Sequence, residues 1–70
     1  MTRDQIAIKL ISLGKDYPIN HKIYNSVMQF FSSRGDIIAE SLFYDSIIDC
    51  LIIRTNCIVL CVENDGYIHS

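Results

Sequence analysis

The first part of the chain repeats its apolar residues at intervals of three and four, the period of an amphipathic helix. Within residues 3–13 the apolar positions fall on one side of such a helix: Ile6, Ala7, Leu10, Ile11 and Leu13. Thr2 and Gln5 have the spacing of a capping box, in which each side chain bonds the backbone N–H of the other residue. These features predict a helix over residues 3–13.

A second helix is indicated after the single proline. Pro18 disfavours helical geometry at Tyr17, so the chain turns there. Asn20 is a favourable N-cap residue. The apolar positions that follow it again recur at three and four: Ile23, Tyr24, Val27, Met28, Phe30 and Phe31. The sequence therefore predicts a helix at about residues 21–33.

After Gly35 the apolar residues are mostly Ile, with Val, Phe and Tyr, which favour pleated strands. Polar pairs at Asp45-Ser46 and Thr55-Asn56 divide this region into three runs. We therefore predict three strands, at 37–44, 47–54 and 57–63, joined as an antiparallel meander. With the two helices, they make one α+β domain of order ααβββ over residues 1–70.

Two parts of this assignment have alternatives. Residues 37–44 also fit a helix, because Ile38, Leu42 and Asp45 would then share one helical face. The tail after the Asn64-Asp65-Gly66 turn is either a short returning strand or a frayed end.

The second and third strands are apolar on both sides. If Thr55-Asn56 is a two-residue loop, Ile52 pairs with Val59 and Cys50 pairs with Cys61, and side chains alternate faces along each strand. One face then carries Cys50, Ile52, Arg54, Cys57, Val59 and Cys61. The other face carries Leu51, Ile53, Ile58, Leu60 and Val62. Antiparallel sheets commonly leave one face to water, so two apolar faces are unusual.

A chain of 70 residues is too short to cover both faces. Such a chain buries only about 60% of its unfolded surface, and two short helices can cover one face of the sheet. An uncovered apolar face usually marks an interface. We therefore predict a protein interface on one face of the sheet, formed by Cys50, Ile52, Arg54, Val59 and Cys61. The mirror-image choice uses Leu51, Ile53, Ile58 and Leu60.

The three cysteines allow other interpretations. Cys50 and Cys61 could form a strained cross-strand disulfide, although an odd number of cysteines without a secretory signal fits a reducing cytoplasm better. Cys50, Cys57 and Cys61 with His69 would supply four zinc ligands, but without the close cysteine pairs typical of zinc modules. Our main interpretation is that the thiols are ordinary core groups, with no metal and no cofactor.

Composition and charge exclude several classes of function. The net charge is −2 and the six basic residues are scattered, so we do not expect nucleic-acid binding. No apolar run approaches the ~20 residues that span a bilayer, so we expect no membrane partner. Neither His21 nor His69 is predicted to lie beside a cysteine, and no glycine-rich phosphate loop is present, so we do not expect an enzyme.

Together these observations predict a small cytoplasmic protein that acts by binding another protein. The partner is either a second copy of this chain, as a homodimer, or a larger host protein that the chain inhibits or adapts. The excess of Ile (13 against 5 Leu) is a bias typical of low-GC genomes, and compact chains of this size are common among phage accessory proteins, which favours that interpretation. Two alternatives stay open, a nucleic-acid-binding regulator of winged-helix outline and a zinc-stabilised module.

Overall fold

A computed structural model describes all residues, 1–70. Helix α1 spans Arg3–Leu13 and helix α2 spans His21–Ser33, so both predicted helices are confirmed. The capping box is present, because the Gln5 N–H donates to Thr2 Oγ1 at 3.2 Å and the Thr2 N–H donates to Gln5 Oε1 at 2.8 Å. Asn20 caps α2 by accepting from the Ile23 N–H at 2.9 Å. Local sequence signals therefore set both helix starts.

Four strands follow the helices: β1 (Ala39–Asp45), β2 (Cys50–Thr55), β3 (Val59–Val62) and β4 (Ile68–His69). They form one antiparallel sheet in the order β1-β2-β3-β4. The α+β class and the order of helices before strands are confirmed. The prediction of three strands is wrong, because the tail returns along β3 as a fourth strand after a turn at Gly66. The helical alternative for residues 37–44 is also excluded.

The predicted register between β2 and β3 is wrong by two residues. Ile52 pairs with Cys61 and Arg54 with Val59, because four residues, 55–58, separate the last paired residues of the two strands rather than two; this connection, which begins at the last residue of β2, is called the 55–58 loop below. Thr55 closes this loop, since its Oγ1 accepts from the Ile58 N–H at 3.0 Å and donates to the Ile58 carbonyl at 2.7 Å. A shift of two residues leaves the side chains that remain in β2 and β3 on their predicted faces, whereas Cys57 and Ile58, which were predicted on the sheet, lie in the loop and are exposed.

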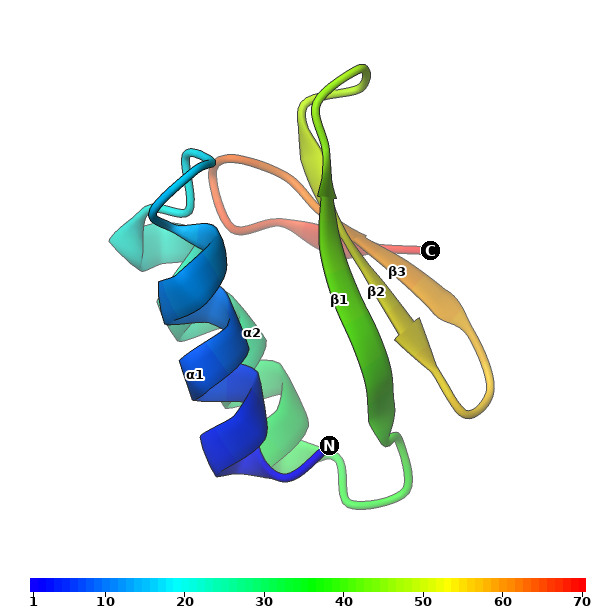
Figure 1. Cartoon of the computed structure of the whole chain (residues 1–70). Coiled ribbons are helices and arrows are strands. Elements are labelled where there is room, and N and C mark those ends of the chain that lie inside the picture. The colour runs from blue at the N-terminus through cyan, green and yellow to red at the C-terminus, as the bar shows by residue number, and fades with distance from the viewer.

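The connection between β1 and β2 is longer than predicted. Ile47 and Ile48 were expected to begin a strand, but they lie in a turn that extends past the ends of the helices (Figure 1). Asp45 Oδ1 accepts from the Ile47 N–H at 3.0 Å, and Asp49 completes the turn with a positive φ of 59°. The Tyr44 hydroxyl donates to Asp49 Oδ1 at 2.7 Å. The side chains of Asp45, just before the turn, and Asp49, its last residue, thus hold residues 46–49 in place.

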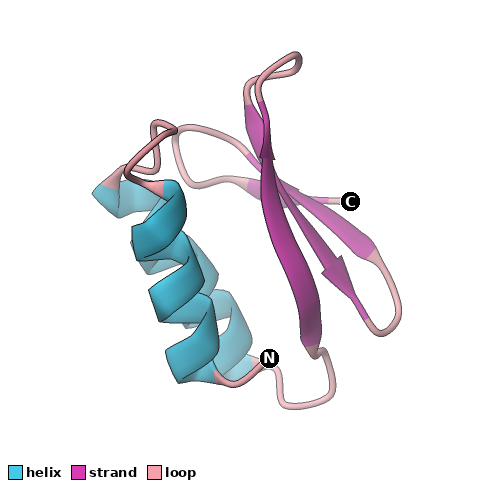
Figure 2. Cartoon of the chain, viewed as in Figure 1, coloured by secondary structure: helices cyan, strands magenta, loops and turns pink.

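The two helices pack side by side on one face of the sheet, and no element covers the other face (Figures 1 and 2). The core lies between the helices and the sheet: Ile6, Leu10, Ile23, Val27, Ala39, Leu42, Tyr44, Leu51, Ile53, Leu60 and Val62. Ile11 was expected on the buried side of α1, but it is exposed. The helices therefore cover the face that carries Leu51 and Ile53, which the sequence left undecided.

Candidate open-face interface

The sheet face without helices is called the open face below. Its residues follow from the strand register and form three rows across the strands. The row next to the 55–58 loop contains Ser41, Arg54 and Val59. The middle row contains Phe43, Ile52, Cys61 and His69. The third row contains Asp45 and Cys50, and Glu63 follows β3 at the same level.

All five residues of the predicted interface lie on the open face, but they differ in exposure. Cys50 and Ile52 are only 3% and 8% exposed, because neighbouring side chains of the sheet cover them. Val59 is 51% exposed, Arg54 is exposed and Cys61 is half-buried. A partner on this face would therefore contact Arg54, Val59 and Cys61 directly, with Cys50 and Ile52 as the layer beneath. Their role in an interface stays a prediction.

Phe43 is the residue of this face that sequence reasoning missed. It pairs with Ile52 in the middle row and is 45% exposed. Its neighbours Leu42 and Tyr44 are buried against the helices, so strand alternation turns Phe43 to the open face. The signal was present in the sequence, but the meander was predicted without a register between its first two strands, and Phe43 was therefore not assigned to a face.

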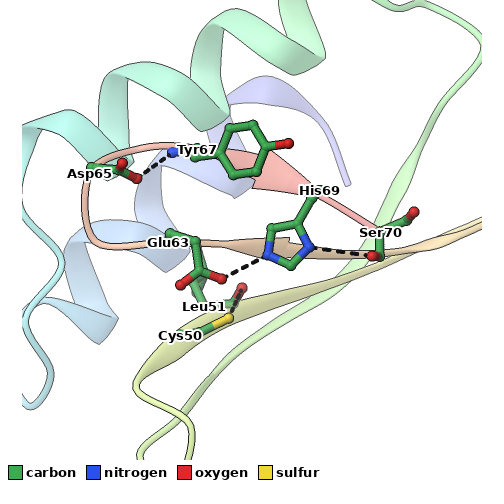
Figure 3. Close-up of polar contacts among 7 residues, drawn as sticks. All are labelled: Cys50, Leu51, Glu63, Asp65, Tyr67, His69 and Ser70. Atoms are coloured by element: carbon green, nitrogen blue, oxygen red, sulfur yellow. Dashed lines mark hydrogen bonds and ion pairs between the residues drawn. The ribbon is translucent and has the colours of Figure 1, made fainter.

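One corner of the open face is polar (Figure 3). His69 Nε2 and Glu63 Oε2 lie 2.7 Å apart, and His69 Nδ1 lies 3.3 Å from the Ser70 carbonyl oxygen. The Tyr67 ring stacks on the His69 ring with 5.5 Å between their centroids. Donation of a hydrogen bond from His69 to the Glu63 carboxylate raises the pKa of His69 above its usual value, and the Ser70 carbonyl oxygen adds to this shift as a second acceptor.

We expect substitution of Glu63 by Gln to lower the pKa of His69, because a neutral amide stabilises the imidazolium less than a carboxylate does. The pair stabilises the fold fully below the ordinary histidine pKa of about 6.5, and this contribution is lost as the pH rises through the raised folded-state pKa. An NMR titration of the His69 ring protons measures the shift. The substitution Asp36→Asn, in the loop before β1, is the matched control and should leave the titration unchanged.

Cys50 lies beside this corner and is a buried thiol. Burial raises the pKa of Cys50 to about 11, and the nearby Cys61 and Glu63 add to the shift. The thiol is thus protonated at neutral pH, and the thiolate is the reactive form of cysteine. All three cysteines are free, and the true register places Glu63 rather than Cys61 level with Cys50. The disulfide interpretation assumed that Cys50 and Cys61 lie directly opposite each other on β2 and β3, and that pairing is absent.

The structure also brings His69 opposite Cys61, a proximity that the sequence did not predict. A histidine that activates a cysteine needs a ring nitrogen directed at the sulfur. Both ring nitrogens of His69 instead face oxygen atoms, those of Glu63 and Ser70. His69 therefore pairs with Glu63 at the edge of the sheet and is not directed at the Cys61 sulfur.

The four residues considered as zinc ligands do not converge. Cys57 is exposed in the 55–58 loop, whereas Cys50 and His69 lie in other rows of the sheet. No group of three or more His, Cys, Asp or Glu side chains is arranged to hold a metal ion. The surface has hollows of about 350, 340 and 380 Å³, and none of them includes Phe43, Val59 or Cys61. The hollows therefore lie away from the exposed centre of the open face.

No protein-family model, curated protein or solved structure matches this chain. Neither helix has the length and hydrophobicity that crossing a lipid bilayer requires.

Proposed function

We propose that this chain is a non-catalytic protein-interaction module that binds its partner through the open face. The observation that supports the proposal most is the exposure of Phe43 (45%) and Val59 (51%) on a sheet face that no other element covers. Burial of such a side chain from full exposure contributes about 1.5–3 kcal/mol, so covering the half that is still exposed would contribute about half of that for each residue. A partner that covered them would add a free energy of stabilisation that is substantial for a domain whose own stability is on the order of 5 kcal/mol.

The shape and chemistry of the open face support a protein as the partner. Sites for small ligands are concave, whereas the exposed centre of this face has no hollow. Its exposed residues combine an aromatic ring (Phe43), an arginine (Arg54) and aliphatic surface (Val59). Aromatic side chains and arginine are enriched in protein interfaces. In this proposal the protein acts in the cytoplasm, as a homodimer or as a small inhibitor or adaptor of phage accessory type docked on a larger protein.

Site-specific photo-crosslinking in the source cells tests the proposal. A photoreactive amino acid at position 59 should give a covalent adduct with a protein, either a second copy of the chain or another polypeptide. The same amino acid at Gln29, which is exposed on α2, is the control and should give no adduct at matched expression. Absence of an adduct from position 59, or equal yields from both positions, would refute binding through the open face.

A further inference from the structure

The open face carries an arrangement of charge that selects one partner. We infer that this partner is a second copy of the chain, packed open face to open face with the strands of the two copies running in opposite directions. This inference rests on the proposed function, because it assigns the occupant of the same surface. The argument uses the three rows and the two ways in which a two-fold axis can relate two such faces.

The charges of the open face are separated along the strands. The row beside the 55–58 loop has Arg54 on the inner strand β2, and no acid lies in that row. At the opposite end, Asp45 on β1 and Glu63 at the end of β3 flank the position of Cys50 on β2. The middle row between these ends has Phe43, Ile52 and Cys61 on its first three strands. Across β1, β2 and β3 the face is therefore positive at one end, apolar in the middle and negative at the other, while on β4 the middle row ends in His69, whose ring contacts the Glu63 carboxylate at 2.7 Å.

Two sheets that pack face to face in an aligned manner keep their strands within about 30° of a common direction. A two-fold axis between them then runs either along the strands or across them. An axis along β2 places each end of one face over the same end of its copy, so Arg54 meets Arg54 and Asp45 lies over Glu63. Like charges would then meet at both ends, which costs free energy.

An axis across the strands, along the middle row, exchanges the two ends. Arg54 of one copy then lies over Cys50 of the other, between Asp45 and Glu63 on the adjacent strands. The two-fold symmetry repeats this contact at the other end of the interface. The middle rows meet each other, so the exposed part of Phe43 is covered by the apolar row of the second copy. This antiparallel arrangement pairs Arg54 with the acids and joins the middle rows, and it places Val59 of one copy over the end of β3 at Glu63 of the other.

The interaction is tested on the whole chain with charge reversals at the two ends of the open face. The wild-type chain should have twice the monomer mass by light scattering after size exclusion. R54E should raise the dimer dissociation constant at least about tenfold, because the new carboxylate meets two acids at each end. The control R3E makes the same change of charge on α1, outside the open face, and should leave the dimer intact. Circular dichroism checks that each variant is folded, and R54Q should give a smaller loss of affinity.

Mixing experiments identify the direction of the strands. In the antiparallel dimer, position 54 of each copy lies beside position 63 of the other. A heterodimer of R54E and E63K therefore places the glutamate of R54E beside the lysine of E63K, and Arg54 of the E63K copy beside Glu63 of the R54E copy. Native mass spectrometry should therefore show this heterodimer in excess over the R54E homodimer. A parallel dimer would also favour this heterodimer, because position 54 then faces position 54 and the lysine at position 63 faces Asp45, so the discriminating mixture is R54E with the wild-type chain. The antiparallel dimer should give the statistical proportion of that heterodimer, because the gain at one end offsets the loss at the other, whereas a parallel dimer would give it in excess. Such an excess would overturn the inferred arrangement.

The remaining outcomes separate this inference from the proposed function. A wild-type chain that stays monomeric at high concentration, or an R54E variant that dimerises like R3E, would overturn the inference. If position 59 still crosslinks to a different polypeptide, the open face is a binding surface and only the identity of the partner is wrong. If the chain is monomeric and position 59 gives no adduct, both proposals fail.

Discussion

Replacing Ile53 by Ala is expected to lower the free energy of unfolding by about 2–5 kcal/mol, the range for truncating a buried isoleucine. Ile53 is fully buried on the inner strand β2, between Leu42 of β1 and Leu60 of β3. A domain of this size has a total stability on the order of 5 kcal/mol, so a loss at the upper end of this range would leave much of the I53A population unfolded at 25 °C. Urea unfolding followed by circular dichroism measures the loss.

The control for I53A is Ile47→Ala, which removes the same atoms from a side chain that is 94% exposed. It should change the free energy of unfolding by no more than about 0.5 kcal/mol, as surface substitutions usually do. Equal losses for the two variants would show that the helices do not cover the Ile53 face of the sheet. The packing of the core described above would then be incorrect.

Replacing Gly66 by Ala should cost about 1–3 kcal/mol, the usual penalty for a non-glycine residue held in a strained backbone conformation. Gly66 has a φ of 91°, and an added Cβ would lie 3.0 Å from the Lys22 carbonyl oxygen of α2. The turn at Gly66 also receives a hydrogen bond from the Ser26 hydroxyl to its carbonyl oxygen. G66A should therefore loosen the contact between this turn and α2, and thermal unfolding should show a lower Tm.

Gly35→Ala is the matched control for G66A, because no atom lies within 4 Å of a Cβ added at Gly35. It should leave the Tm unchanged or raise it slightly, since alanine restricts the unfolded chain more than glycine does. A G66A variant as stable as G35A would mean that the turn before β4 is not held against α2. The position of β4 at the edge of the sheet would then be in doubt.

The two helices were predictable because their determinants are local. The capping residues Thr2 and Asn20 lie within a few positions of the groups that they bind, and the apolar period continues through each helix. Exposure was less predictable. Ile11 fits the apolar stripe of α1 as well as Leu10 does, yet only Leu10 is buried, because the contact between α1 and the rest of the molecule is narrower than the stripe.

The sheet was predictable as a pattern but not in its register. Side-chain alternation placed Ile52, Val59 and Cys61 on one face, and this grouping survives the two-residue shift because the shift is even. The loop that produces the shift is closed locally by Thr55, and Asn56 also ties it to the segment before β1. The side-chain oxygen of Asn56 accepts from the Ile38 N–H at 2.8 Å, and its side-chain nitrogen donates to the Asp36 carbonyl at 3.1 Å. These contacts join residues that are distant in sequence, so no local signal reveals them.

By itself, the sequence determined the two helices, the change to a sheet after Gly35 and the set of residues that share each sheet face, because helical and strand periods are properties of neighbouring positions. Only the tertiary structure decided that the helices pack on Leu51 and Ile53, since both faces are apolar and either could have been covered. It also decided that Phe43 joins the open face and that opposite charges lie at its two ends. Those features depend on the register between strands, which is set by contacts across the whole chain.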